Sequence, residues 1–495
     1  MKKIWIFLLP ILMPAMATAQ VDKLPTAAQV QRYLQKATAG DVDAQYNVAI
    51  CYEHGYGVDQ SDSAAYSWYL KAAEQGDVEA QCHLARCYLN GVGVDTSARD
   101  AAVWYRKAAE QGSPDAQYAL AGLCAEGKGV RQSYTDAVRW WRMAASQGLA
   151  TAWFELGMCY DKGHGVEQSY SEALQCWQRA ASQGVTAAQN NIASYYYEGH
   201  GVSQSFAEAI YWWNKSASKG DGDALFALGN CCLYGSGVKQ SASDACDYFL
   251  QAAEKEHGAS QVELGRCYEK GLGVKASATE AVHWFRRAAE HGYAQGQCNL
   301  ARCYELGIGE TASTAEAVKW YNLAAENGDK EALYRMGIMY YVGRGVKRSL
   351  TEAVRYFRLA AEKGYAPAQN SLGMCYDKGE GVEQSLPEAL HWYRVAAEQG
   401  DSEAQYNLGL CYDTGHGVEK QHDEAAAWFL KSARQGNSDA QFDLGMCYYL
   451  GRGVEHSMTN ALYWWRKAEK QNHRKAKRML ARINGEKPAS KTGGK

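Results

Sequence analysis

A pair of glycines with G-x-G spacing recurs twelve times along this 495-residue chain, and each occurrence follows the last by 36 residues. The pairs run from Gly55/Gly57 to Gly451/Gly453, with no insertion or deletion between them. A fixed period of this length is the signature of stacked repeats rather than of separate domains. We therefore expect one repeating unit over residues 40–471, which is twelve times 36, or 432 residues.

Each 36-residue block contains two helical patterns, which in the first block fall near 43–54 and 62–74. In the first helix the slot of Val48 is apolar in all twelve blocks, and the slot of Ala49 holds only Ala or Gly. In the second helix the slot of Tyr69 is aromatic in all twelve blocks. Because a small residue opposite a large ring lets two helices interdigitate at native density, each block is predicted to be a tightly packed helical hairpin.

Local signals mark where these helices begin and end. Ser fills the slot of Ser61 in eleven blocks, and an acidic residue follows three positions later in ten, as in Ser97 and Asp100. This spacing predicts a capping box at the start of the second helix. Gly55 and Gly76, with their counterparts in the other blocks, stand where a left-handed residue would end each helix.

A single hairpin cannot bury its aromatic face, so the blocks are expected to stack into an all-α solenoid with one continuous core. Residues 20–39 are expected to hold an N-terminal capping helix, and residues 472–484 a C-terminal one, because Ala476 and Leu480 fall in register. Residues 485–495 are expected to form a disordered basic tail.

The first residues have the pattern of an export signal. Lys2 and Lys3 precede an apolar stretch, and Ala17-Thr18-Ala19 supplies a small-residue cleavage site. Residues 1–19 are therefore predicted to be a cleaved signal peptide that sends the chain to the periplasm or the medium. Gln20 stands where a lipoprotein would need Cys, and no later run of about 18 apolar residues predicts a membrane span.

The fifteen cysteines are interpreted mainly as small buried hydrophobes, because nine of them share the slot of Cys51. Packed helices lie about 8–10 Å apart, whereas a disulfide needs Cα atoms within about 7 Å. Two pairs within single blocks, Cys159–Cys176 and Cys232–Cys246, stay open as possible bridges.

No motif predicts a metal, a cofactor or a catalytic centre. The twelve histidines are scattered, and those between the two glycines, such as His416, are interpreted as solvated loop residues. An S-x-x-K motif at Ser216–Lys219 and a K-T-G motif at Lys491–Gly493 match parts of a β-lactamase signature, but no S-D-N element accompanies them. Ser216 fills a slot that is Ala in ten blocks, so it is expected in the core.

Two stretches carry a family resemblance. A-Q-x-x-L-G-x-x-Y-x-x-G-x-G-V is present from Ala404 to Val418, and S-x-x-E-A-x-x-W-Y-x-K-A-A-E-Q-G is nearly unbroken from Ser97 to Gly112. These motifs resemble the Sel-1-like repeat, a relative of the tetratricopeptide repeat. The resemblance implies a right-handed superhelix and a non-enzymatic adaptor that binds partner proteins or peptides.

By resemblance to tetratricopeptide arrays, the first helix of each block lines the concave face, and its free slots are those of Tyr46, Ile50, Glu53 and His54. These slots vary between blocks, and Arg and Tyr are common interface anchors. The predicted partner-binding residues in these slots are Arg86, Tyr197, Arg266, Glu269, Arg302, Glu305, Tyr341 and Tyr449.

Three classes of function remain from the sequence. The leading interpretation is an exported interaction scaffold for a protein or peptide. A binder of peptidoglycan or polysaccharide in the cell envelope is the alternative. A weaker alternative is a β-lactamase or penicillin-binding protein, because one cysteine-rich exported branch of the family is associated with penicillin binding, although its paired cysteines are not reproduced here. The net charge of -3 argues against nucleic acid as the main partner.

Overall fold

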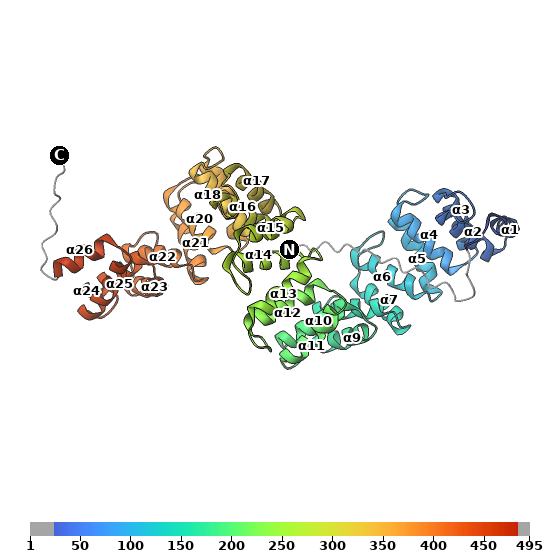
Figure 1. Ribbon diagram of the computed structural model, residues 1–495, viewed down its shortest axis with the longest axis horizontal. Coiled ribbons are helices and arrows are strands. Elements are labelled where there is room, and N and C mark those ends of the chain that lie inside the picture. Colours follow the sequence, from blue (N-terminus) through green and yellow to red (C-terminus); the bar gives the residue numbers. More distant parts are fainter. Residues whose placement is uncertain (1–23, 484–495) are drawn as a thin grey trace. The chain divides into compact units, whose positions relative to one another are not determined.

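The computed structural model describes residues 24–483, and over that range it contains twenty-six α-helices and no strand (Figure 1). The predicted signal peptide and the predicted basic tail lie outside the described residues. The chain divides into two compact units, one up to Ala224 and one from Leu225 onward. The solenoid of helical repeats expected from the 36-residue period is confirmed.

Every repeat consists of a first helix and a second helix joined by the glycine turn. The first helices are α2 (Val42–His54), α4 (Val78–Asn90), α6 (Pro114–Glu126), α8 (Ala150–Lys162), α10 (Thr186–Glu198), α12 (Gly222–Tyr234), α14 (Gly258–Lys270), α16 (Ala294–Leu306), α18 (Lys330–Val342), α20 (Ala366–Lys378), α22 (Ser402–Thr414) and α24 (Ser438–Leu450).

The second helices are α3 (Asp62–Glu74), α5 (Ala98–Glu110), α7 (Tyr134–Ser146), α9 (Tyr170–Ser182), α11 (Phe206–Ala217), α13 (Ala242–Ala253), α15 (Ala278–Glu290), α17 (Thr314–Glu326), α19 (Leu350–Glu362), α21 (Leu386–Glu398), α23 (His422–Arg434) and α25 (Met458–Lys470). Single helices flank the repeats, α1 (Ala27–Thr38) before them and α26 (Arg474–Ile483) after them.

The two helices of a repeat approach each other as closely as the Ala/Gly slot predicts. A Cβ atom added to Gly157 would lie 2.3 Å from Nε1 of Trp177, and one added to Gly409 would lie 2.7 Å from the ring of Phe429. Both rings are almost fully buried. The smallest side chains are therefore needed where the largest rings cross the first helix.

Only half of the predicted capping box forms at the second helices. Ser97 Oγ accepts a hydrogen bond from the Asp100 amide at 3.2 Å, as expected for an N-cap. The Ser97 amide, however, donates to the Tyr88 carbonyl of the preceding first helix at 2.8 Å, and the same bond recurs in every repeat. The acidic side chain therefore has no N-cap amide to accept from, because the turn between the helices already uses it.

Buried glutamines join successive repeats. Gln81 Nε2 donates to the Ala73 carbonyl at 3.1 Å, and Gln111 Nε2 donates to Gln81 Oε1 at 2.9 Å. The same pair of bonds recurs at Gln117 and Gln405. Because a buried amide without partners is costly, these bonds fix how one repeat sits on the next.

The second glycine of a turn, such as Gly165 in the fourth repeat, packs against the preceding repeat. Gly165 has a φ of +72°, and a Cβ atom there would lie 2.4 Å from the carbonyl carbon of Tyr134, at the start of α7. Gly163, the first glycine of the same turn, has nearly the same φ of +69° but only a 3.3 Å approach to the Gln168 side chain. The two glycines thus have the same backbone conformation, but only Gly165 lies against the backbone of the preceding repeat.

We expect Gly165→Ala to destabilise the protein more than Gly163→Ala. Both substitutions place a side chain at positive φ, which costs about 1 kcal/mol, whereas Gly165→Ala also forces two repeats apart, which costs roughly 1–3 kcal/mol more. Native-state hydrogen exchange in α7 and α8 measures the difference. Equal losses for the two variants would contradict the close contact.

The cysteines are buried thiols. All fifteen are free, thirteen are buried, and Cys82 and Cys232 are half-buried. The nine that share the slot of Cys51 are all buried, which confirms their interpretation as small hydrophobes. Neither pair that was open as a bridge is joined; Cys246 Sγ instead donates to the Leu272 carbonyl at 3.0 Å.

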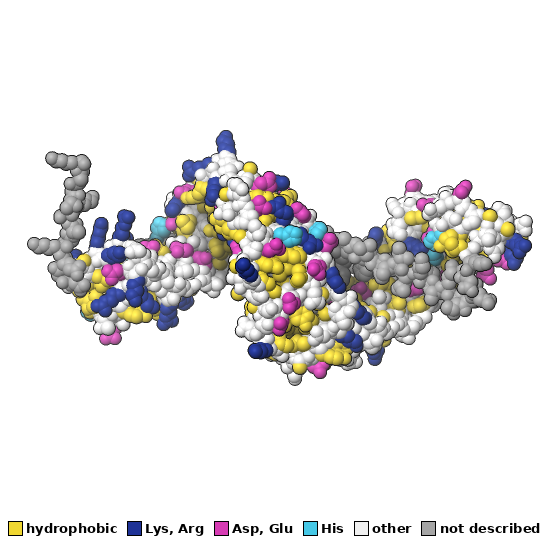
Figure 2. Space-filling view, in the orientation of Figure 1, with side chains coloured by type: hydrophobic (Ala, Val, Ile, Leu, Met, Phe, Trp, Pro, Cys, Tyr) yellow, Lys and Arg dark blue, Asp and Glu magenta, His cyan; other side chains and the backbone are white. Residues whose placement is uncertain are grey.

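The surface mixes charged and apolar groups. Figure 2 shows acidic, basic and hydrophobic side chains interspersed on the visible face, with Lys and Arg gathered around α25 and α26. Of the helices in residues 24–483, none has the length and apolar character that crossing a membrane requires.

Candidate functional site: the first-helix face

The first-helix face is formed by the slots of Tyr46, Ile50, Glu53 and His54 in each repeat. All eight residues predicted for partner binding lie on first helices, and all are half-buried. Each of them contacts another side chain of the protein. The structure therefore engages all eight in contacts within the protein, and for all but Arg266 these contacts link two helices or a helix and a turn.

Glu53 on α2 is the centre of one cluster in this network. Its carboxylate lies 3.1 Å from Arg86 Nη2 and 3.4 Å from His83 Nδ1, both on α4, and accepts a hydrogen bond from Tyr69 Oη. Burial opposes ionisation of Glu53, but the hydrogen bonds from His83 and Tyr69 and the Arg86 charge outweigh it and lower its pKa to about 2. Arg86 thus pairs with the preceding repeat.

A second pair joins α14 to α16 in the second unit. Arg302 Nη1 and Nη2 each lie 2.8 Å from a carboxylate oxygen of Glu269, which is a bidentate ion pair. The hydrogen bond to Glu269 raises the pKa of Arg302. Arg266 behaves differently, because its guanidinium bonds Glu263 on its own helix at 2.5 Å. The structure thus brings Arg302 and Glu269 together and leaves Arg266 outside the pair.

The glycine turn of one repeat also reaches the first helix of the preceding repeat. Arg344 Nη1 lies 3.2 Å from Glu305, and Tyr341 Oη donates to Glu380 Oε2 at 2.6 Å. His416 Nε2 lies 2.7 Å from Asp377 Oδ1 in the same arrangement. His416 is exposed in its loop, as its interpretation as a solvated loop residue expects, and the stacking of repeats also places it beside a carboxylate.

Tyr197 and Tyr449 pack against the second helix of their own repeat. The Tyr197 ring centroid lies 5.2 Å from that of Phe206 and 5.5 Å from that of Trp213. The Tyr449 centroid lies 5.5 Å from that of Trp465. These distances are those of ordinary aromatic packing, so both rings stabilise the hairpin while keeping one side half-exposed.

Exposed apolar residues on this face were missed from the sequence. Leu306 is 60% exposed and Val342 is 56% exposed, and they end the first helices of two successive repeats. Tyr234 and Leu450 occupy the same slot and are also exposed. The signal was available, because this slot holds polar or charged residues in the eight other repeats.

Of the two β-lactamase-like motifs, only Ser216–Lys219 lies within the described residues. Ser216 is fully buried, which confirms its expected place in the core, and Lys219 Nζ donates to the Gly184 carbonyl at 2.7 Å. The K-T-G motif lies outside the described residues. Between residues 24 and 483, no group of three or more His, Cys, Asp or Glu side chains gathers as a metal site.

The fold and this face define a helical-repeat solenoid of the tetratricopeptide-like kind, an interaction scaffold by architecture. The family model described as Sel1 repeat matches the chain twelve times, and the chain therefore belongs to the Sel1 repeat family. The matched residues are 42–77, 78–113, 114–149, 151–185, 186–221, 222–257, 258–293, 294–329, 330–365, 366–401, 402–437 and 438–473.

Two solved structures are similar to this chain. A protective antigen present in uropathogenic Escherichia coli strains, which displays an SLR fold, is 33% identical, with a TM-score of 0.54 over 94% of this chain and 99% of that chain. A Sel1 repeat protein from Oxalobacter formigenes is 32% identical, with a TM-score of 0.49 over 62% of this chain and 89% of that chain. A comparison with curated protein sequences gives no match.

Proposed function

We propose that this protein is an exported adaptor that binds a partner protein or peptide on the first-helix face of its second unit. The observation that carries the proposal is the exposure of Leu306 and Val342 in the same slot of successive repeats. Exposed apolar side chains rimmed by polar groups are typical of protein interaction sites. The basic and apolar pattern around Lys2 and Lys3 supports export.

Residues of two ion pairs stand within four positions of these apolar side chains in the sequence, Arg302 and Glu305 before Leu306 and Arg344 after Val342. Arg302 and Glu269 are each about one-fifth exposed, so their pair is shielded from solvent without being closed off. Glu305 is held between Arg344 and the Tyr321 hydroxyl, which donates to it at 2.8 Å. Because these side chains are already ordered, a partner loses little side-chain entropy by contacting them, which favours binding.

This function is tested by a photocrosslinking residue introduced in living cells in place of Lys378, followed by cell fractionation. Lys378 is exposed and ends the next first helix in the same slot as Leu306 and Val342, so both of those residues stay available for substitution. We expect crosslinked partner in the periplasm or medium. We expect the double variant Leu306→Ser, Val342→Ser to lower its recovery at least tenfold, because the apolar contact is lost. Leu359→Ser is the matched control, since Leu359 is 37% exposed but lies on a second helix.

Circular dichroism of each variant must show that the helices remain. Recovery that survives the double substitution, or that falls equally in the Leu359→Ser control, would contradict the assignment of the first-helix face. Adducts confined to the cytoplasm would contradict the export part of the proposal.

A further inference from the structure

One slot of the second helix departs from the repeat pattern in a single repeat. The slot directly before that of Tyr69 holds Trp in nine second helices and Tyr in two, at Tyr248 and Tyr356, but it holds Cys176 in α9. Cysteine carries only a sulfur atom on its Cβ atom where tryptophan carries an indole, so the volume of the bicyclic ring is missing at that position. Trp428 in α23 occupies the same slot 252 residues later and shows what the indole contacts there.

The Trp428 ring lies partly buried between three kinds of neighbour. It packs against the apolar cluster that includes Leu408, with Tyr412 beside it. Arg394 Nη2 donates to the Tyr412 hydroxyl at 2.9 Å. Lys431, three residues after the Trp, lies 3.6 Å from the centre of the ring. The indole is thus held by an apolar floor, an Arg–Tyr pair and a cation.

The same neighbours surround Cys176, although the ring is absent. Leu156 and Tyr160 stand at the positions of the leucine and tyrosine just described. Arg142 Nη2 donates to the Tyr160 hydroxyl at 2.7 Å. Arg179, three residues after Cys176, supplies the cation. The surroundings of an indole are therefore preserved around a side chain that cannot fill them.

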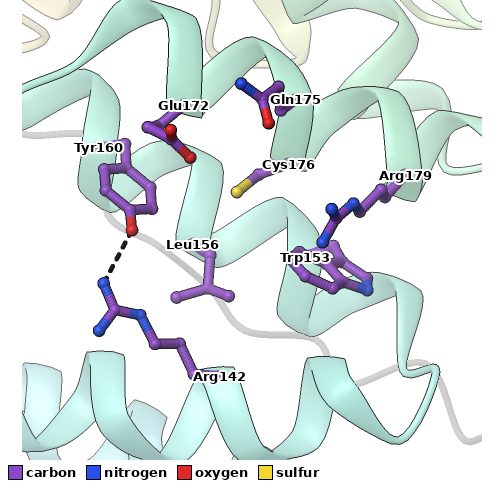
Figure 3. Close-up of a pocket in the computed structure, with 8 residues that line it drawn as sticks. All are labelled: Arg142, Trp153, Leu156, Tyr160, Glu172, Gln175, Cys176 and Arg179. Carbon is purple, nitrogen blue, oxygen red and sulfur yellow. Dashed lines mark hydrogen bonds between the residues drawn. The ribbon is translucent and has the colours of Figure 1, made fainter.

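A cavity of about 220 Å³ lies at this point and is called here the Cys176 pocket (Figure 3). It is lined by Arg142, Trp153, Leu156, Tyr160, Glu172, Gln175, Cys176 and Arg179. Leu156 and Cys176 are buried and form its floor, whereas both arginines, Glu172 and Gln175 are exposed at its rim. A cavity of about 150 Å³ in another protein admits benzene, so this one has room for a larger aromatic ring.

Trp153 adds an aromatic wall that the other repeats lack. It is the one Trp between residues 24 and 483 that lies outside the two aromatic slots of the second helix, and it stands where Gln405 stands in the later repeat. The Arg179 guanidinium lies 4.3 Å from its ring centre. Figure 3 shows Trp153 beneath Arg179 on one side of the pocket and Tyr160 on the other.

We infer that the Cys176 pocket binds the side chain of a tryptophan from a partner protein. This goes beyond the proposed function, because the pocket lies in the first unit, and only the protein origin of the ring rests on that function. The indole would lie on Leu156 and Cys176 between the two aromatic walls, which favour offset or edge-to-face contacts. Arg179 adds a cation–π contact. The rim carries two arginines and one glutamate and therefore has a net positive charge, which favours an acidic residue beside the partner's tryptophan.

Cys176 acts as an apolar floor in this arrangement. Burial raises the pKa of its thiol to about 11, so the thiol is neutral at physiological pH. Binding therefore involves contact and no covalent step.

The inference is tested by titrating the full chain with N-acetyl-L-tryptophanamide and following amide and methyl resonances by NMR. We expect one site, at least tenfold weaker in Cys176→Trp, because the chain's own indole then fills the pocket. Arg179→Gln adds no bulk and is expected to weaken binding at least threefold. Tyr356→Trp, which adds an indole in the same slot of another repeat, is expected to change nothing.

The outcomes separate this inference from the proposed function. No binding to the original protein, or equal binding in Cys176→Trp and Tyr356→Trp, overturns the pocket. Binding of free indole without binding of N-acetyl-L-tryptophanamide overturns the assignment to a tryptophan residue. If Leu306→Ser, Val342→Ser abolishes partner recovery and Cys176→Trp does not reduce it, the proposed function stands and this inference fails.

Discussion

Replacing Glu155 by Gln is expected to stabilise α8 and its neighbours by about 3 kcal/mol at pH 8, and by much less at pH 4. Glu155 is only 9% exposed, and its carboxylate has no hydrogen-bond or ion-pair partner among the residues that the structure describes. Burial raises its pKa from 4.5 to about 7. The folded state therefore holds this carboxyl protonated where the unfolded chain ionises it.

The sign follows from the raised pKa. Well below pH 4.5 the carboxyl is protonated in both the folded and the unfolded state, so the free energy of unfolding does not change with pH through this group. Between pH 4.5 and 7 the unfolded state releases its proton first, so stability falls as pH rises, and it levels off above pH 7.

Native-state hydrogen exchange in α8 at several pH values measures this effect, because a twelve-repeat solenoid opens locally rather than all at once. Glu126→Gln is the control, since Glu126 is exposed at the end of the preceding first helix. A difference between the original protein and Glu155→Gln that stays constant from pH 4 to 8 would show that Glu155 ionises normally.

Glu53→Gln is expected to have the opposite effect, a loss of up to about 3 kcal/mol at pH 7. The pKa of Glu53 is lowered from 4.5 to about 2, so its stabilising effect is present above pH 4.5 and is lost as pH falls through 2. The amide of Gln still accepts from Tyr69, but it carries no charge to pair with Arg86.

Hydrogen exchange in α2 and α4 should show the two proteins converging as pH falls from 4.5 toward 2. Glu198→Gln provides the comparison, because that carboxylate is 54% exposed in its contact with His200. A loss in Glu53→Gln that is as large at pH 2.5 as at pH 7 would mean that packing, rather than charge, holds the cluster together.

The fold could be predicted from the sequence because the same order of small, aromatic, capping and glycine positions recurs in every repeat. The first and second helices expected near 43–54 and 62–74 are Val42–His54 and Asp62–Glu74. The capping box failed in part, since the Ser97 amide donates to the Tyr88 carbonyl at 2.8 Å. That bond depends on the path of the turn in space, which local spacing does not reveal.

The candidate site was harder to predict than the fold. The slots that form the first-helix face were identifiable, but the pairing of Arg302 with Glu269 depends on how one repeat rests on the next. The exposure of Leu306 could have been found by comparing slots across repeats. Cys176 was visible in the sequence as a departure from the repeat pattern. Whether its neighbours close over the space of the missing ring depends on the packing in three dimensions, and here they leave a cavity.

The contact between Gly165 and the start of α7 has a consequence for how such a chain can change. A turn whose backbone is in close contact with the preceding repeat cannot gain or lose residues without losing that contact. Variation in length can then enter only as whole modules gained or lost, and new binding specificity must come from single side-chain exchanges on a scaffold of constant pitch.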